Sequence, residues 1–457
     1  MDNNKEKKSL GLAIKPVFNK RGFKIKIFNK KNYYVQYPAG IFEKYSDKNF
    51  LTDNFIYART VTLSIAQNKA LHYHTGRPFL KDFIDWGIKQ DFGRLSDKTN
   101  ISSKELRRRF LEKKITFENK PISKLNKTNN HSAKNAVLAL SFGKDSLLTY
   151  GLIKEIGLNY YLSSDLDEQN FTPNQWRRRL KIINLFKRRE KENLLCFHDN
   201  VDTLHFNKED IAKPIEELEN TNGMLSFALE LMPIAYKVKA KYIIFGNERD
   251  VSEYYFNSAG DKSYMAFDQS QIYTKKLNQS LARAGGEIRI ASLIEPLYNL
   301  AEIKILNSRY PHLLKYIMSC YPNAASPNHW CHHCPICAEM FLLLAAVGGN
   351  PTDVGLTGNL FTRKEKEYYS LFDKKISRTN GKSDVEKGEL LAFLLAYRQG
   401  WRGYLIDLFK EKYLKEAVRR EKELRCRVFG IHESVNLPHE YGGKILKIFK
   451  QELNNLS

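Results

Sequence analysis

The sequence has no long apolar run, and this absence excludes a membrane-spanning chain. The longest candidate, Met340–Val347, is far shorter than the roughly 18 apolar residues that a spanning helix needs. The start of the chain does not show the pattern of a secretory signal peptide, and no repeat of fixed period predicts a solenoid. We therefore expect a cytoplasmic protein that has no membrane partner.

Cysteine is scarce, with six residues in 457, yet four of the six lie within eighteen positions. Two overlapping Cys-x-x-Cys turns and a fourth thiol supply the four soft ligands that a tetrahedral Zn²⁺ prefers. A disulfide framework would suit a secreted protein instead. An iron–sulfur cluster, or the replacement of one thiol by His329, His332 or His333, stays open. We expect a closed, structural zinc site at Cys320, Cys331, Cys334 and Cys337.

Acidic residues are too few to balance the basic ones, since 51 Asp and Glu against 74 Lys and Arg give a formal charge of +23. Such an excess favours a nucleic-acid partner, because bound Lys and Arg release counterions from phosphates. The chain is also rich in Lys, Asn and Ile, a composition that an AT-rich genome produces, and its basic residues are spread widely. A nucleic-acid surface is therefore a hypothesis, which salt-dependent binding would test.

The most informative stretch is an apolar run at 136–140 that stops at Ser-Phe-Gly-Lys-Asp-Ser, residues 141–146, before an apolar helical pattern. This order predicts a strand, a tight loop and a helix. The unpaired N–H groups of the first helical turn, and the positive end of the helix dipole, then point at one place. We expect a phosphate or pyrophosphate site there, with close approach at Gly143, positive charge from Lys144, and hydroxyl donors from Ser141 and Ser146.

The first part of the chain differs in pattern from the middle. Residues 1–117 contain alternating apolar and polar stretches at 23–28 and 61–65, and a β-prone run at 33–37. These patterns are typical of half-buried strands, so we expect a β-rich N-terminal domain. Residues 118–134 are rich in Asn and poor in apolar side chains, which predicts a linker or a disordered loop.

Residues 135–348 alternate strand and helix, which predicts an α/β domain with a parallel, doubly wound sheet. The strand candidates are 136–140, 160–164, 194–198, 242–245 and 288–291. Ligands of such sheets bind beyond the carboxyl ends of the strands, where the sequence has Ser141, Asp165, Asp199 and Gly246. Residues 349–457 combine helical spacing with many charges, and we expect a basic, helical C-terminal region there.

The loop sequence is not a Walker motif, which needs Gly-x-x-x-x-Gly-Lys-Ser/Thr. It resembles the PP-loop of the ATP pyrophosphatases, with Phe142 where that family usually has glycine. The resemblance implies an enzyme that splits ATP at the α-phosphate, attaches AMP to a substrate oxygen and releases pyrophosphate. It implies nucleotide contacts at Leu140, Ser141, Phe142, Gly143, Lys144, Asp145, Ser146, Asp165 and Gly246.

Residues 135–345 resemble one family of this group more closely, 7-cyano-7-deazaguanine synthase of queuosine precursor synthesis. The likeness consists of the PP-loop and then, in order, Ala235-Tyr236, Ile243–Asp250, Ile294–Leu297, Ala301–Ile303, Ser319-Cys320-Tyr321 and the last three cysteines of the cluster. It implies a central PP-loop domain with a zinc lobe and a need for ATP and Mg²⁺. It also implies catalytic roles for Lys144, Asp145 and Arg249, with Glu248 and Asp250 near substrate or phosphate.

In that family ATP activates the carboxylate of 7-carboxy-7-deazaguanine as an acyl adenylate, ammonia attacks it to give an amide, and a second ATP dehydrates the amide to a nitrile. About 130 residues precede the matching part and about 110 follow it. Extended relatives of this kind resemble members of bacterial and archaeal anti-phage systems, in which the chemistry can stop at the amide and a protein amino terminus replaces ammonia. The sequence does not show which amine is used.

Three hypotheses follow from the sequence. The first is an ATP-dependent C–N ligase that acts on a deazaguanine-type acid and uses ammonia or a partner protein as the acyl acceptor. The second is a tRNA-modifying PP-loop enzyme, which the net charge favours. The third is a non-catalytic, nucleotide-binding defence scaffold, for which Phe142 leaves room.

Overall fold

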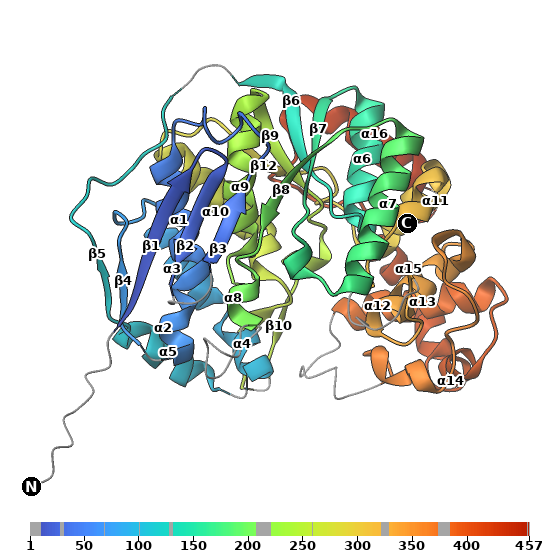
Figure 1. The fold of residues 1–457 in the computed structure, drawn as a ribbon. Coiled ribbons are helices and arrows are strands. Elements are labelled where there is room, and N and C mark those ends of the chain that lie inside the picture. The colour runs from blue at the N-terminus through green and yellow to red at the C-terminus, as the bar shows by residue number, and fades with distance from the viewer. Residues whose placement is uncertain are drawn as a thin grey trace, which may run out of the picture.

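The computed structural model describes residues 11–27, 32–67, 69–99, 101–127, 131–206, 221–257, 259–320, 329–372, 384–454 and 456 (Figure 1). Its strands are β1 (Leu12–Asn19), β2 (Gly22–Lys26), β3 (Asn32–Gln36), β4 (Leu71–Tyr73), β5 (Ile115–Phe117), β6 (Ser132–Ala139), β7 (Asn159–Asp165), β8 (Leu194–Asp199), β9 (Ala240–Phe245), β10 (Tyr254–Phe256), β11 (Lys262–Tyr264) and β12 (Arg289–Ser292). Strands β10 and β11 form a separate two-stranded sheet, and the other ten form one sheet in the order β12-β9-β6-β7-β8-β3-β2-β1-β4-β5.

The helices of the first half are α1 (Lys48–Thr60), α2 (Thr62–Gln67), α3 (Lys81–Gln90), α4 (Phe92–Thr99), α5 (Ser103–Glu112), α6 (Lys144–Ile156), α7 (Pro173–Glu190), α8 (Thr203–Phe206) and α9 (Gly223–Lys237). Those of the second half are α10 (Gln271–Arg283), α11 (Asn299–Arg309), α12 (Pro335–Ala346), α13 (Asp384–Arg398), α14 (Tyr404–Lys412), α15 (Leu414–Val428) and α16 (His439–Leu453). Short 3-10 helices lie at Glu168–Asn170, Asp250–Ser252, Phe267–Gln269, Pro311–Tyr316, Pro351–Val354 and Lys364–Tyr368. The protein is therefore a mixed α/β structure, and no described helix is both long and apolar enough to cross a membrane.

The five strands expected in the middle of the chain are confirmed, and they pair in parallel as β12-β9-β6-β7-β8. The chain runs from β6 outward to β8 on one side and then returns to β9 and β12 on the other, so the direction of winding reverses at β6. Both faces of β6 are covered, because Leu138 belongs to one buried apolar cluster and Val137 to the other. The carboxyl end of a strand at such a reversal is where sheets of this kind bind ligands.

The N-terminal segment continues the same sheet rather than building its own. Strand β3 pairs antiparallel with β8, with Val35 opposite Asp199, and Figure 1 shows β1, β2 and β3 side by side with β8. Helices α1–α5 take up more of residues 12–117 than strands β1–β5 do, so the expectation of a β-rich composition is wrong. The division of the chain into domains stays a prediction.

One predicted strand is a helix. Residues 61–65 alternate in polarity, but all five are buried, and the structure forms α2 directly after α1. Alternation indicates a strand when one face meets water, whereas here Thr62 and Ser64 are as buried as their apolar neighbours. The Ser64 hydroxyl bonds the carbonyl of Val61 at 2.7 Å, which satisfies its polar group within the helix.

The connection at 118–127 contains neither helix nor strand, but it is held against the rest of the protein. Leu125 is 7% exposed, and its N–H donates to the carbonyl of Ala284 at 2.9 Å. The Ser123 hydroxyl donates to Asp53 at 3.2 Å. The interpretation of a disordered loop is therefore wrong for these residues, while residues 128–130 of the expected linker lie outside the described part of the chain.

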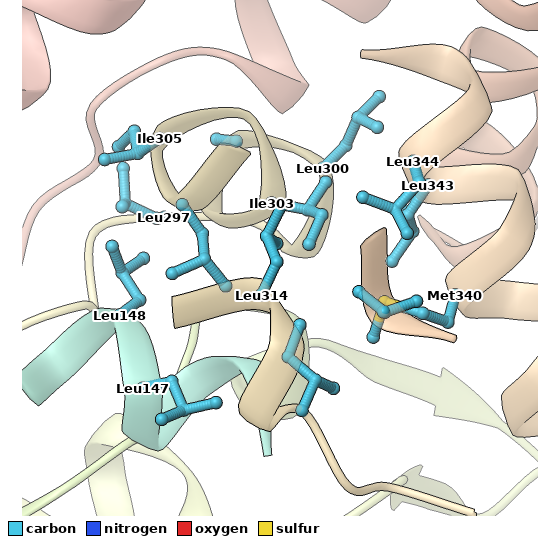
Figure 2. Close-up of a cluster of buried hydrophobic side chains, with 14 of the residues drawn as sticks. Leu147, Leu148, Leu297, Leu300, Ile303, Ile305, Leu314, Met340, Leu343 and Leu344 are labelled. Carbon is cyan, nitrogen blue, oxygen red and sulfur yellow. The ribbon is translucent and has the colours of Figure 1, made fainter. Parts of the chain in front are cut away.

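The C-terminal region is helical, as expected, and it shares an apolar core with the middle of the chain. Figure 2 shows Leu147 of α6, Leu300 and Ile303 of α11, and Met340 and Leu344 of α12 meeting in one cluster. The same cluster extends through α13 to α16. These helices therefore hold α6 and α12 in place relative to each other.

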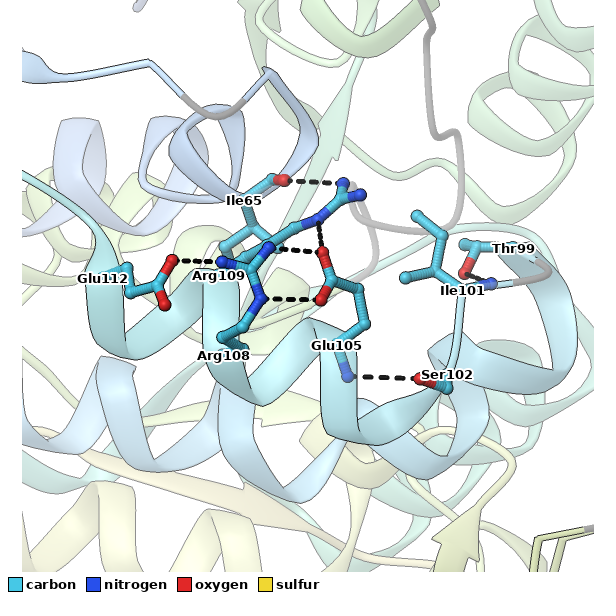
Figure 3. Close-up of polar contacts among 8 residues, drawn as sticks. All are labelled: Ile65, Thr99, Ile101, Ser102, Glu105, Arg108, Arg109 and Glu112. Atoms are coloured by element: carbon cyan, nitrogen blue, oxygen red, sulfur yellow. Dashed lines mark hydrogen bonds and ion pairs between the residues drawn. The ribbon is translucent and has the colours of Figure 1, made fainter.

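Helix α5 is rich in charged side chains. Ser102 caps it by accepting from Glu105 N at 3.2 Å, and Glu105 accepts from Arg108 and Arg109 at 2.8 Å (Figure 3). Pairs three and four residues apart lie on one helix face. This charge run is therefore a solvated helix face in which the basic residues have acidic neighbours.

Candidate functional site

The expected strand, loop and helix are present, because β6 ends at Ala139 and α6 begins at Lys144. Gly143 occupies the N-cap position, and no side chain caps the first turn of α6. The Ser141 and Ser146 hydroxyl oxygens lie 3.2 Å apart, and Gly143 N donates to Ser141 Oγ at 3.3 Å. Uncapped N–H groups with hydroxyls beside them favour an anionic ligand.

Phe142 adopts the backbone conformation that usually requires glycine. Its φ is 66°, in the left-handed region that non-glycine residues seldom occupy. The ring is completely buried and meets Phe186 edge-on, with ring centroids 5.3 Å apart. Because the ring belongs to the apolar core, it leaves the open side of the loop clear.

Gly246 follows β9 and lies against the start of α6. A Cβ atom there would lie 2.9 Å from Asp145 Cβ and 3.0 Å from Ser146 N, closer than real Cβ contacts. Any side chain would push the strand end and the helix apart. The absence of a side chain at Gly246 therefore lets the end of β9 approach the start of α6. The expected contact of Gly246 with a nucleotide stays a prediction.

Lys144 is 8% exposed and lies between two carboxylates. Its Nζ pairs with Asp145 and, at 3.1 Å, with Glu302 Oε2. Burial alone would lower the pKa of Lys144, but the nearby carboxylates outweigh burial and raise it well above its usual value. Burial likewise would raise the pKa of Asp145, but Lys144 outweighs it and the pKa is lowered. Both side chains therefore stay charged.

Three carboxylates converge beside this lysine. One oxygen each of Asp145, Glu248 and Glu302 lies within 4.8 Å of the other two. Glu302 is 1% exposed, and its Oε1 has no hydrogen-bond partner in the described structure. Burial raises the pKa of Glu302 well above its usual value, and burial with the charge of Asp145 raises that of Glu248 to about 8. One lysine does not offset the charge of three ionised carboxylates, so burial favours the protonated forms of the two glutamates. A divalent cation bound here would favour their ionised forms, and such oxygen ligands suit Mg²⁺.

Asp165 lies at the end of β7, next to the strand that leads into the loop. Its carboxylate accepts from the backbone N–H groups of Asp167 at 3.2 Å and Asp199 at 3.1 Å, and from the side-chain amide of Asn170 at 3.1 Å. Burial and the charge of Asp199 raise its pKa to about 8. The side chain is thus already engaged by the protein, and the predicted contact with adenosine stays a prediction.

The structure places Arg249 beside the C-terminal segment rather than at the three carboxylates. Its side chain lies 3.6 Å from Glu253 and donates to the carbonyl of Glu433 at 3.4 Å. Asp250 accepts from Asn299 N at 2.7 Å, and burial raises its pKa to about 6. Asp250 therefore holds the start of α11, the helix that carries Glu302.

The four clustered cysteines meet as predicted. Their sulfur atoms lie within 4.8 Å of one another, with Cys320 and Cys334 3.9 Å apart and Cys331 and Cys337 3.7 Å apart. Zn–S bonds of about 2.3 Å in a tetrahedron place sulfurs about 3.8 Å apart, whereas a disulfide joins them at about 2.05 Å. The cluster can bind a metal such as zinc, and its donor set fits one.

The nearby histidines have other partners. The ring of His329 bonds the carbonyl of Ile317, and His332 Nε2 accepts from Thr357 N at 3.0 Å. Cys334 caps α12, and Cys337 lies in its first turn, so the helix start supplies two of the thiols. Tyr321, which belongs to the predicted Ser-Cys-Tyr motif, lies outside the described residues.

Glu302 is the residue whose role sequence reasoning missed. It was expected only as part of a resemblance, whereas the structure makes it the partner of Lys144. A signal was present, because Glu302 stands in the apolar run Leu300-Ala301-Glu302-Ile303. A lone carboxylate on a helix face that must be buried needs a partner, but the sequence does not say where that partner lies.

No family model matches the chain, and no curated protein matches it either. A functional assignment therefore depends on the geometry of the site itself.

Proposed function

We propose that the protein is an ATP-dependent ligase that adenylates a 7-carboxy-7-deazaguanine-type acid and joins it to an amine. The observation that carries this proposal is that Lys144 and three carboxylates lie beside the uncapped start of α6. A departing pyrophosphate needs hydrogen-bond donors to its oxygens and a divalent cation in the same place. The deazaguanine acid as substrate is supported by the order of the motifs that resemble 7-cyano-7-deazaguanine synthase.

The reaction has two steps. A carboxylate oxygen of the acid attacks the α-phosphorus of ATP, and the bond from that phosphorus to the oxygen of pyrophosphate breaks. The amine nitrogen then attacks the acyl carbon, the C–N bond forms, the bond to AMP breaks and the nitrogen loses a proton. Adenylation is needed because a carboxylate is a poor electrophile, whereas AMP is a good leaving group.

Each part of the site has a proposed role in this sequence. The N–H groups of the first turn of α6 and the hydroxyls of Ser141 and Ser146 bind pyrophosphate, and Lys144 offsets its charge. Asp145, Glu248 and Glu302 would hold Mg²⁺, which stabilises the charge that develops on the leaving oxygens when it is bound. Four thiolates leave no open position on zinc, so its role is structural.

The same acyl adenylate serves either acceptor. Ammonia would give an amide, which a second ATP could dehydrate to a nitrile, whereas an amino group of a partner protein would give a protein conjugate. The regions outside residues 135–345 are large enough to contact a protein partner. Conjugation in an anti-phage system is therefore part of the proposal, and nucleic acid remains a candidate partner because of the net charge of +23.

A tRNA-thiolating enzyme is the less favoured function. Such chemistry needs a reactive thiolate outside the zinc cluster, which leaves Cys196 and Cys426. Cys196 is only partly exposed, and burial raises its pKa, so its thiolate is scarce at neutral pH. AMP release that tRNA stimulates would nevertheless favour this alternative.

The test is release of AMP and pyrophosphate from ATP and Mg²⁺, measured with the full-length protein. Release should depend on 7-carboxy-7-deazaguanine and on an amine, supplied as ammonium or as a partner protein from the same operon. Mass spectrometry of the partner would show a fixed gain in mass if it is the acceptor. ATP binding without turnover under every condition would favour the non-catalytic scaffold.

Two variants and one control sharpen this test. Lys144→Ala should lower pyrophosphate release at least about 100-fold, since donors to developing charge have effects of this size. Ser146→Ala, a smaller change, should lower it without altering the melting temperature. Lys450→Ala changes an exposed lysine of α16 and should leave release unchanged. Normal release by folded Lys144→Ala protein would contradict the proposed role of this loop.

A further inference from the structure

A short segment joins the cysteine cluster to the nucleotide loop. Met318 N donates to the carbonyl of Phe142 at 2.8 Å, Ser319 follows it, and Cys320 belongs to the four-cysteine cluster. At the other end of the segment, the carbonyl of Ile317 bonds the ring of His329, which stands two positions before Cys331 of the cluster. Residues 317–320 therefore contact both sites directly.

Ser319 lies at the open side of the loop. A Cβ atom at Gly143 would lie 3.9 Å from Ser319 Oγ, 3.5 Å from Ser141 Oγ and 3.9 Å from Asp145 Oδ2. Two hydroxyls and one carboxylate thus surround the position at Gly143 that has no side chain. That position is also next to the uncapped first turn of α6, where an anion is favoured.

The Ser319 hydroxyl is available to a ligand. The side chain is partly exposed, and within the described residues its hydroxyl forms no hydrogen bond. By contrast, the Ser141 and Ser146 hydroxyls already bond each other. A serine hydroxyl can donate one hydrogen bond in whichever direction its rotation allows, so Ser319 can turn toward a group held above Gly143.

We propose that Ser319 donates a hydrogen bond to a phosphate group bound at the loop, and that the metal on Cys320 holds Ser319 in that position. Nucleotide binding and metal retention then stabilise each other through residues 318–320. This inference rests on the proposed function in one respect, namely that the ligand of the loop is ATP.

The coupling has a direct physical basis. Coordination restrains Cys320, and the peptide bond transmits this restraint to its neighbour Ser319, while Met318 N holds the carbonyl of Phe142. Loss of the metal frees one end of the segment, so binding ATP must then pay the entropy of ordering it. Because coupling between two binding sites is reciprocal, ATP must raise the affinity for the metal by the same factor by which the metal raises the affinity for ATP. We expect this gain in affinity to appear as slower metal release.

The first measurement is the affinity of zinc-loaded, full-length protein for ATP with Mg²⁺, by isothermal titration calorimetry. Ser319→Ala should raise Kd roughly 10-fold or more, as expected for a lost hydrogen bond to a charged group, with zinc content unchanged. Ser319→Thr keeps the hydroxyl and should restore most of the affinity. Ser280→Ala is the control, because its exposed hydroxyl bonds only Lys276 of its own helix.

The second measurement is the rate at which zinc passes to a chromogenic chelator, with and without saturating ATP and Mg²⁺. ATP should slow zinc release several-fold in the wild type and in Ser280→Ala, but not in Ser319→Ala. This readout needs no turnover, so it does not depend on the identity of the acid or the amine.

The outcomes separate this inference from the proposed function. ATP binding to the wild type that Ser319→Ala leaves unchanged, or zinc release that ATP does not slow, would overturn the inference alone. Purified Ser319→Ala that has lost its zinc, together with Ser319→Thr that regains the zinc but not the affinity for ATP, would also overturn the phosphate contact. Absence of ATP binding to the wild type would overturn the proposed function and this inference together.

Discussion

Lys144 Nζ lies 3.1 Å from Glu302 Oε2, although 158 positions separate the two residues in the chain. The contact joins the start of α6 to α11, and it places the buried carboxylate of Glu302 opposite the positive charge of the loop. Removing one partner of a buried pair leaves the other uncompensated. The pair therefore contributes to the stability of the loop. It also sets the net charge that the loop presents to a ligand.

Glu302→Gln should weaken the binding of the Mg²⁺ that supports pyrophosphate release. The change removes one proposed oxygen ligand's charge but keeps its shape, and Asp145 still pairs with Lys144. We expect the Mg²⁺ concentration at half-maximal rate to rise about 10-fold, the lower end of the effects of disturbing a metal's surroundings. Glu155→Gln, which changes a carboxylate paired with Arg309, is the control. An unchanged Mg²⁺ dependence would exclude Glu302 as a ligand.

Metal removal should destabilise the cysteine lobe before it affects the rest of the protein. Structural zinc sites contribute on the order of 10 kcal/mol to folding, and all four thiols are buried. We expect chelation, or Cys334→Ser, to lower the melting temperature strongly and to release one zinc per chain. Cys426→Ser changes an exposed cysteine and should do neither. A stripped protein with the melting temperature of the wild type would contradict a structural role.

Phe142→Gly should be more stable than Phe142→Ala, which reverses the usual order. Both variants lose the buried ring, at a cost of about 3–5 kcal/mol. The left-handed backbone at this position, with φ of 66°, costs an alanine about 1–2 kcal/mol but costs glycine almost nothing. At Leu147, inside α6, glycine should instead be the less stable. The midpoint of urea unfolding measures the stability of the glycine and alanine variants at both positions. If the same one of the two substitutions were the more stable at residue 142 and at residue 147, the explanation would be refuted.

Gly246→Ala should impair the loop, because its methyl group would meet Asp145 and Ser146 at 2.9–3.0 Å. Overpacking of this kind costs about 1–3 kcal/mol, and a shifted helix start should also weaken ATP binding. In Gly443→Ala the new methyl group would meet nothing within 4 Å, so this α16 variant should be neutral or slightly stabilised. Wild-type affinity for ATP in Gly246→Ala would show that the close approach is dispensable.

Asp53 should make the protein less stable as the pH rises from about 4 to about 7. Burial raises its pKa to about 7, against about 3.9 in an unfolded chain. The folded state therefore binds this proton more tightly, so the contribution is fully present below about pH 4 and is lost as the pH rises through about 7.

Asp53→Asn removes this titration while it retains the shape of the side chain beside Ser123. Relative to the wild type, the variant should gain stability between pH 5 and pH 8, by an amount on the order of a few kcal/mol. Urea unfolding at several pH values measures the difference. A difference that stays constant over this range would show that Asp53 is ionised in the folded protein.

Local patterns predicted what depends on neighbours in sequence. The apolar runs that became β6, β7, β8, β9 and β12 are confirmed, because strand formation and the turn at residues 140–143 depend on nearby residues. The cysteine cluster is confirmed for a similar reason: three of its four members lie within seven positions, so one turn and one helix start bring them together. The strand predicted at residues 61–65 is wrong, because its polar side chains are buried rather than exposed to water.

The sequence by itself determined that the loop with Ser141, Gly143 and Lys144 lies between a strand and a helix, β6 and α6, and that four thiols gather near α12. Only the tertiary structure decided that Phe142 points into the core, that Glu302 faces Lys144 and that β3 extends the sheet at β8. The direction of a side chain and the contacts between distant segments depend on which faces of the helices and the sheet pack together. The spacing of residues along the chain predicts the elements but not which of their faces meet.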